Sequence, residues 1–467
     1  MSSSQATLEN HLVDFIHGFD LSRVSDRALG NAKLLMQDQL ALQIGCSLLP
    51  WSKETFAYAL TQARPGRSSI VASGKTVDAG TAAFVNAIYG HAFEYDDILS
   101  GSSAHPGCCV VPAALALGEE CDSSVQDVLT AMIVGYEVYT RLGVLAAPTL
   151  IEKGWHPHCV LANFGAAAIA ARLWRLDRLH TFHAMSIAMS HCSGTTEYTS
   201  TGGSIKRVHS GIGVQNGIHA AAMARAGITG PDRFLTGTKG FFQTFIQRPA
   251  GEASANAFRL DSPLQIEQVW IKPYCCCGAN HAPIDAIATW RDRTADIERV
   301  EVRVQPKSNR VVGNHNQHIY SPRGITEVQY ALPVQMALSV LGLGNGYATH
   351  RAYLDGKLDF SEAGAILSMA RRVKIIEAPE FDNNYIQKWV AEVTAFFRDG
   401  TSEKLFVEDS VGTPARPMNQ DQFRVKYDEL AGEVLGGKRA DELFQKLSQL
   451  DMSKPVGSLT ALTYASA

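Results

Sequence analysis

Apolar positions recur at helical spacing through most of the first 260 residues. In the stretch TAAFVNAIYGHAFEYDD, Phe84, Ile88, His91 and Tyr95 follow one another at steps of three or four residues and would share one helix face. The pattern therefore predicts a helix over residues 84–97. Further on, the Ala-rich stretch before GITGP predicts a helix that ends near Gly227. We expect this part of the chain to be all-helical.

The pattern changes from about residue 265. In IERVEVRVQP, valines alternate with charged residues at Val300, Val302 and Val304, the period of a half-buried strand. The segment VAEVTAFFRDGTSEKLFVED contains two strand-like runs around Asp399-Gly400, which predicts a hairpin. The segments EVQYALPVQMALSVLG and FSEAGAILSMARRV have helical spacing. This middle part is predicted to be α+β.

Helical spacing returns in DQFRVKYDELAGEVL and ADELFQKLSQL, after a connector that contains proline and glycine. We therefore predict a mainly α protein with a large helical domain built from residues 1–264 and 409–467. Residues 265–408 would form a smaller α+β lid domain inserted into it. The 467 residues are long enough for two or three domains.

The composition excludes some classes of partner. Lys and Arg number 42 against 46 Asp and Glu, a net charge of −4, so we expect neither nucleic acid nor an acidic membrane surface as a partner. The nine cysteines are scattered and odd in number, which indicates a reducing compartment rather than a disulfide framework. The first residues show no signal-peptide pattern, and we expect a cytoplasmic location.

Three histidines stand at predicted helix starts. His156 precedes Pro157, and because the residue before proline is pushed out of the α region, His156 is predicted at a helix N-cap. His105 precedes Pro106 in AHPGCCVVPAALALGEE, and His281 follows Asn280, a candidate N-cap. Each site alone is typical of an ordinary capped turn. Together they indicate anion binding, because helix N-termini carry free N–H groups and partial positive charge.

Charged residues accompany these histidines. Lys206 and Arg207 follow two glycines at the start of another predicted helix, where a positive charge is disfavoured unless it is used. On the predicted 84–97 helix, Glu94 would lie one step around from the face of His91. Asp97 would neighbour Glu94 at i+3, whereas Asp96 would project elsewhere. Convergence of these groups would suit a small polycarboxylate and proton transfer at a carbon next to its carboxylate.

Two other functions remain open at this point. His156 and His158, or His315 and His318, could supply zinc ligands beside Cys275–Cys277, although the chain has no C-x-x-C or H-E-x-x-H motif. A non-catalytic binding module is the second alternative. Nucleotide binding is disfavoured, because the chain contains no GxxxxGK[ST] sequence.

The blocks NAIYGHAFEYDD, AHPG, GWHP, GGSIKRVHSGIGVQNG, GITGP and KPYCCCGANHAPIDAI, in this order, resemble the signature blocks of the MmgE/PrpD family, and AEVTAFFRDGTSEK resembles its late lid hairpin. The family includes 2-methylcitrate dehydratases, cis-aconitate decarboxylases and iminodisuccinate epimerases. The resemblance implies a homodimer without metal or other cofactor, whose active site lies between a helical domain and a lid.

The resemblance also implies roles for individual residues. The family's pocket positions fall on Glu94, His105, His156 and Lys206, and its lid histidine falls on His281. Arg207 and Asp97 would help to bind the substrate, and a lid tyrosine would fall near Tyr320, by spacing alone. Glu94 departs from the Asp that commonly opens its block, so reach and pocket size would differ.

The activity implied is therefore that of a lyase, a dehydratase or a decarboxylase, on a citrate-like or aconitate-like acid. His105 or His156 would act as base or acid, Lys206 and Arg207 would hold carboxylates, and Glu94 would orient a histidine. An epimerase of the iminodisuccinate type could use the same residues and is the alternative.

Overall fold

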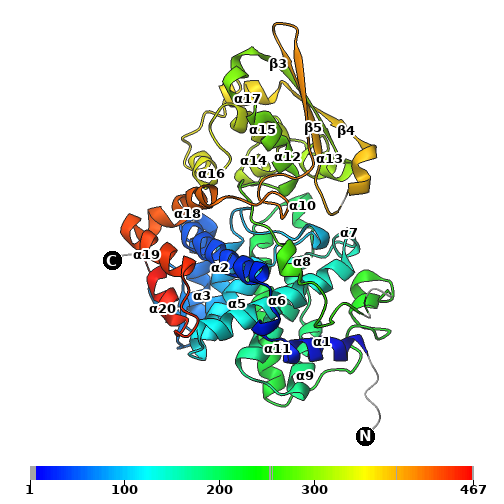
Figure 1. Ribbon diagram of the computed structural model, residues 1–467, viewed down its shortest axis with the longest axis vertical. Helices are drawn as coiled ribbons and strands as arrows, with labels where there is room; N and C mark the ends of the chain where they lie inside the picture. Colours follow the sequence, from blue (N-terminus) through cyan, green and yellow to red (C-terminus); the bar gives the residue numbers. More distant parts are fainter. Residues whose placement is uncertain (1–6, 252–253, 255, 385, 465–467) are drawn as a thin grey trace. The chain divides into compact units, whose positions relative to one another are not determined.

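The computed structural model describes residues 7–251, 254, 256–384 and 386–464 (Figure 1). The chain divides into two compact units. The first consists of residues 1–92, 96–269 and 430–467, and the second of residues 93–95 and 270–429. The assignment of residues 265–408 to a lid domain stays a prediction.

The first unit is built almost entirely from helices, as the apolar spacing predicted. They are α1 (Leu8–Gly18), α2 (Asp26–Cys46), α3 (Pro50–Gln62), α4 (Ala79–Gly90), α5 (Gly107–Glu120), α6 (Val125–Ala146), α7 (Thr149–Glu152), α8 (Pro157–Leu173), α9 (Arg178–Ser190), α10 (Tyr198–Thr201), α11 (Ile205–Arg225), α19 (Gly437–Ser448) and α20 (Gly457–Thr460). Helix α18 (Gln420–Leu435) joins the two units along the chain.

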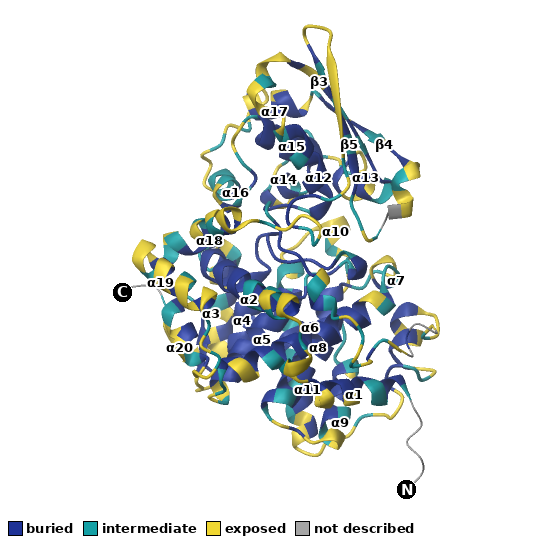
Figure 2. Cartoon of the chain, in the orientation of Figure 1, coloured by how far each residue is buried: buried dark blue, intermediate teal, exposed yellow. Residues whose placement is uncertain are grey.

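Helix α8 lies at the centre of this unit, packed against α5, α6, α9 and α11. Nearly all of its residues are buried, as Figure 2 shows by the dark blue of α8 and its neighbours. Helix α6 is long and apolar enough to cross a membrane, but 83% of its apolar window is buried inside the unit. An apolar helix enclosed in this way is typical of a protein core.

Glycines allow α11 to approach α8 closely. A Cβ atom on Gly213 would lie 2.6 Å from the carbonyl oxygen of His158, and one on Gly217 would lie 2.4 Å from that of Asn163. Both distances are below contact distance, so only glycine fits at these positions. The two glycines are four residues apart and share one face of α11.

Two local predictions for the first unit were wrong. The short antiparallel strands β1 (Ser68–Ile70) and β2 (Lys75–Val77) interrupt the helices. Helix α4 ends at Gly90 rather than continuing to residue 97, with His91 as its C-cap, and Glu94 has a left-handed backbone with φ of +56°. Because residues 91–97 include neither proline nor a further glycine, local sequence gave no stop signal there.

The second unit contains a four-stranded sheet in the order β4-β3-β5-β6, with strands β3 (Ile297–Val304), β4 (Val373–Glu377), β5 (Ala391–Phe397) and β6 (Ser402–Val407). The predicted hairpin is confirmed, since β5 and β6 pair antiparallel across Asp399-Gly400. Strand β3 is antiparallel to β5 and parallel to β4, and it buries Val300, Val302 and Val304 as its alternation predicted.

The helices of this unit pack against the sheet and one another. They are α12 (His281–Ala288), α13 (Pro306–Val312), α14 (Ile325–Gln329), α15 (Leu332–Val340), α16 (Tyr347–Leu354) and α17 (Ala365–Ala370). Helix α12 contacts β5 and β6, and α15 contacts β4 and α17. The prediction of an α+β segment within a mainly α protein is thus confirmed.

Candidate active site

Three helix starts in the first unit carry three of the predicted site residues. His156 is the N-cap of α8, with extended backbone and Pro157 as the first helical residue, as the His-Pro pair predicted. His105 lies directly before Pro106, the N-cap of α5, and Lys206 is the second residue of α11. The orphan N–H groups and positive ends of these helices favour anions at their N-termini.

Five imidazole rings gather near these helix starts. We call His91, His105, His156, His158 and His209 the histidine cluster. The ring centroid of His158 lies 4.4 Å from that of His91, 4.4 Å from that of His156 and 5.3 Å from that of His105. His209, on α11, is 5.0 Å from His156. His105 is the most exposed, with 15% of its side chain accessible; the other four residues are at most 4% exposed.

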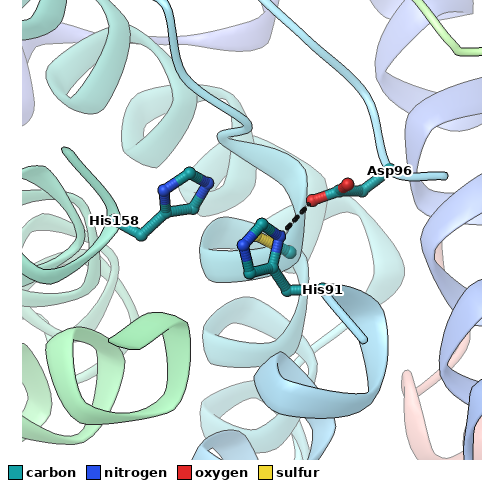
Figure 3. Close-up of side chains that lie close together, drawn as sticks. His91, Asp96 and His158 are labelled. Atoms are coloured by element: carbon teal, nitrogen blue, oxygen red, sulfur yellow. Dashed lines mark hydrogen bonds and ion pairs between the residues drawn. The ribbon is translucent and has the colours of Figure 1, made fainter. Parts of the chain in front are cut away.

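A buried carboxylate lies behind this cluster. An oxygen of Asp96 is 2.7 Å from Nδ1 of His91, and both side chains are fully buried (Figure 3). Figure 3 also shows His158 beside His91, and the two rings are stacked with their planes 28° apart. The second oxygen of Asp96 lies 3.8 Å from Nδ1 of His105. Asp96 is thus placed to stabilise positive charge on either ring.

The backbone determines the tautomer of His105. Its Nδ1 is 2.7 Å from the carbonyl oxygen of Asp97. Because a carbonyl only accepts hydrogen bonds, Nδ1 must carry a proton and donate it. The neutral ring then has its lone pair on Nε2, and the charged ring has a transferable proton there.

His156 is in a different environment. Its Nδ1 lies 2.9 Å from Nδ1 of His209, and the ring of Tyr198 meets both edge-on. Burial, and after it the neighbouring histidines, hold the pKa of His156 well below its ordinary value of 6.5. Burial also lowers the pKa of His209. Both rings are therefore neutral near pH 7.

Asp97 is fully enclosed by the protein. Its carboxylate oxygens accept hydrogen bonds from the backbone N–H of Gly107 and the hydroxyl of Tyr136. Burial, and after it the charge of Asp96, raises the pKa of Asp97 to about 8. These contacts show how Asp97 holds the start of α5. The predicted role of Asp97 in substrate binding stays a prediction.

The two basic residues at the start of α11 differ in their surroundings. Lys206 is partly exposed and precedes His209 by three residues, on the same side of the helix. The guanidinium of Arg207 lies 4.3 Å from the ring centre of Trp51, and its Nε donates a hydrogen bond to the carbonyl of Ala92. Arg207 thus contributes to packing in the first unit, and its predicted contact with substrate stays a prediction.

The remaining predicted residues, Glu94, His281 and Tyr320, belong to the second unit. The carbonyl of Glu94 accepts a hydrogen bond from the ammonium group of Lys272, which also lies 3.6 Å from the Glu94 carboxylate. His281, the first residue of α12 after the predicted N-cap, is fully buried, and burial, with Lys272 next, lowers its pKa to about 3. The hydroxyl of Tyr320 donates to the carbonyl of Val373.

One group of residues has the composition of a metal site. Among the described residues, donor atoms of His91, Asp96, Cys108 and His158 all lie within 4.8 Å of one another. A tetrahedral zinc ion needs ligand atoms about 3.3 to 3.8 Å apart. The rings of His91 and His158 are stacked with their centroids 4.4 Å apart and their planes 28° apart, whereas the ligands of one tetrahedral ion approach it from well-separated directions. Stacked rings, with His91 hydrogen-bonded to Asp96, fit a tetrahedral metal centre poorly.

The sequence did not identify four residues of this arrangement as site residues. Asp96 was predicted to project away from His91, a prediction that was wrong because α4 ends at Gly90 and the chain turns back. His91 was taken only as a position on a helix face, and His158 only as a possible zinc ligand. A signal existed for His209, which shares its helix face with Gly213 and Gly217 at steps of four residues.

Comparison with known proteins gives similarity over nearly the whole chain. A cis-aconitate decarboxylase of Aspergillus terreus is 25% identical over 493 aligned residues, covering 99% of this chain and 96% of that protein. The cis-aconitate decarboxylase-like protein oryM of Aspergillus oryzae is also 25% identical, covering 99% and 98% of the two chains. The human cis-aconitate decarboxylase is 23% identical and covers 96% and 92%.

Two family profiles match the chain in succession. The MmgE/PrpD N-terminal domain matches residues 10–252, and the MmgE/PrpD C-terminal domain matches residues 274–450. The first match contains the histidine cluster and Lys206, and the second contains His281 and Tyr320. The resemblance of the sequence blocks is thereby confirmed, and the chain belongs to the MmgE/PrpD family.

Proposed function

We propose that this chain is a lyase that removes carbon dioxide from an aconitate-like tricarboxylic acid without a metal or other cofactor. The observation that carries the proposal is the setting of His105: its Nδ1 is held by a backbone carbonyl, a buried carboxylate lies 3.8 Å away, and its side chain is 15% exposed. In the charged form of this ring, the proton on Nε2 is available for transfer. The names of the relatives support the choice of substrate class.

In the proposed reaction, His105 acts as the acid. Its charged ring gives the Nε2 proton to the far carbon of the substrate's double bond. The methylene carbon attached to the near carbon of the double bond loses its carboxylate as carbon dioxide. The electron pair of the broken bond forms the new double bond between the methylene carbon and the near carbon. Asp96 stabilises the charged ring before transfer, and solvent returns the proton afterwards.

The other predicted residues bind the substrate in this proposal. Lys206 supplies a positive charge at the start of α11, and His156 supplies a neutral donor at the start of α8. Both helix N-termini favour the substrate's carboxylates. Glu94, His281, Tyr320, Arg207 and Asp97 keep the roles that the family resemblance implied, as predictions, and a homodimer remains our expectation.

Two other outcomes use the same groups. A neutral His105 could take the proton next to a carboxylate, as a dehydratase or an epimerase requires. The test is NMR of the purified protein in D2O with cis-aconitate, 2-methylcitrate and iminodisuccinate separately. Loss of one carboxylate carbon with deuterium in the product supports the proposal. Loss of water would instead identify a dehydratase, and inversion with deuterium uptake an epimerase.

If the protein reacts with none of the three acids, the proposed substrate class is overturned. The variant His105→Asn tests the assignment of the acid and should lower turnover about 100-fold or more. The matched control is His180→Asn, because His180 is a partly exposed histidine at the start of α9 whose ring pairs with Asp177. Equal turnover in the two variants would contradict the role of His105.

A further inference from the structure

His209 lies behind His156, and neither the sequence pattern nor the family match assigns it a function. The two Nδ1 atoms are 2.9 Å apart, which is hydrogen-bond distance. A single proton can lie between them, so one ring donates and the other accepts. The hydrogen bond therefore couples the tautomers of the two rings: whichever ring carries its proton on Nδ1 leaves the other with its proton on Nε2.

The fold keeps His209 in this position. His209, Gly213 and Gly217 occupy one face of α11, and the two glycines let this face approach α8 to a distance that no side chain would permit. The ring of His156 is fixed from the other side, because its backbone N–H donates to the carbonyl of Gly194 and Pro157 follows directly. The two residues are 4% and 3% exposed, so water does not compete for their hydrogen bond.

The charge of the substrate decides between the two tautomers. The proposed substrate carries carboxylates, and His156 lies at the positive end of α8. A ring with a lone pair on Nε2 would repel a carboxylate, whereas a ring with Nε2–H would donate a hydrogen bond to it.

We propose that His209 is a positioning residue that donates its Nδ1 proton to Nδ1 of His156 and thereby holds His156 as the Nε2–H tautomer, a neutral donor for a substrate carboxylate. This inference rests on the proposed function for its choice of ligand. The neighbouring Tyr198, edge-on to both rings, limits their rotation. Both rings stay neutral near pH 7 because burial lowers their pKa values.

The first test reads the tautomer directly and needs no turnover. In NMR spectra of protein labelled with [15N]histidine, Nδ1 of His156 should have the shift of an unprotonated ring nitrogen and Nδ1 of His209 that of a protonated one. The spectrum of His156→Gln assigns the His156 signals. A protonated Nδ1 on His156 would overturn the proposal. This measurement stands even if the protein is inactive on all three acids, so failure of the two proposals can be told apart.

The second test uses substitutions at position 209. The amide of His209→Asn can place an N–H group near the position of Nδ1, whereas His209→Leu removes the donor and keeps a similar volume. In His209→Leu, loss of a hydrogen bond that holds a charged ligand should raise KM for the acid roughly 10-fold. In His209→Asn, KM should return most of the way to the value of the unmodified protein.

A matched control comes from the same helix. His219 lies ten residues further along α11 and is partly buried, so His219→Leu makes the same chemical change away from His156. Its KM should stay at that of the unmodified protein. An unchanged KM in His209→Leu, or an equal rise in His209→Leu and His219→Leu, would show that His209 does not position His156.

Discussion

Nδ1 of His91 lies 2.7 Å from a carboxylate oxygen of Asp96, and neither side chain is accessible to solvent. Such a pair is stable in the protein interior only if the hydrogen bond between its members replaces their lost hydration. The second oxygen of Asp96 lies 3.8 Å from His105. One carboxylate therefore connects a structural histidine with the proposed proton donor.

The substitution Asp96→Asn should affect both stability and turnover. It keeps the shape of the side chain but removes the charge, so the His91 hydrogen bond weakens and the charged form of His105 loses its support. We expect a fall of about 1 to 3 kcal/mol in the free energy of unfolding and at least a roughly 10-fold loss of kcat. Urea unfolding and initial rates measure the two effects.

The matched control is Asp14→Asn. Asp14 pairs with Arg178 at the surface, where both side chains are about half exposed. Surface pairs of this kind contribute little, so the control should change stability by less than about 1 kcal/mol and leave kcat unchanged. A similar loss of kcat in both variants would remove Asp96 from the proposed mechanism.

Asp97 predicts a dependence of stability on pH. Its pKa is about 8 in the folded protein, raised first by burial and then by Asp96, and it is near 3.8 when exposed. Between these values the folded chain binds a proton that the unfolded chain does not, so this group's contribution to stability is lost as pH rises from about 4 to 8. Asp97→Asn should therefore unfold at a higher temperature than the unmodified protein at pH 8, with a smaller difference at pH 5.

An amide can replace both hydrogen bonds of Asp97. Its oxygen can accept from Gly107, and its N–H can donate to the hydroxyl oxygen of Tyr136. Thermal unfolding at several pH values tests the prediction. Parallel curves for the two proteins would show that Asp97 does not change its protonation on unfolding in this range.

The close packing of α8 and α11 predicts a large effect of one methyl group. In Gly213→Ala, the new Cβ would lie 2.6 Å from the carbonyl of His158 and 2.8 Å from the Cβ of Ala162. Helix α11 must then move away from α8, which should cost about 1 to 3 kcal/mol of stability and lengthen the contact between His156 and His209. Denaturant unfolding and the KM for the acid measure these two consequences.

Gly30→Ala is the control for that substitution. Gly30 lies within α2, and a Cβ added there would meet no neighbouring group within 4 Å. Alanine there should stabilise the protein by about 0.5 to 1 kcal/mol, because it favours helix without a clash. If Gly213→Ala were as stable as Gly30→Ala, the packing described between α8 and α11 would be incorrect.

Helix starts in this chain could be predicted because their signals are local. Pro157 restricts the backbone of His156, and Asn280 precedes α12, so the N-termini of α8 and α12 follow from neighbouring residues. The strand Ile297–Val304 follows from alternation in the same way. The family blocks then indicated the substrate class, which no single residue indicates.

The interior of the site could not be predicted, because it depends on contacts between residues far apart in the sequence. His156 and His209 are separated by 53 positions and meet only because glycines let two helices approach. Helix α4 ends at Gly90 although the apolar spacing continues, so the direction of Asp96, which turns back to His91, was also missed. Apolar periodicity identifies the buried face of a helix but not the element that packs against that face.

The geometry of the histidine cluster also predicts the response to metal removal. The stacked rings of His91 and His158, and the engagement of His91 by Asp96, disfavour a tetrahedral ion at His91, Asp96, Cys108 and His158. Dialysis against a chelator should therefore leave kcat unchanged, and elemental analysis should find much less than one zinc per chain. Addition of cobalt(II) should give no thiolate charge-transfer band. Stoichiometric zinc that disappears together with activity in Cys108→Ser would instead establish a metal centre, and His105 would then act beside a metal ion rather than as an independent acid.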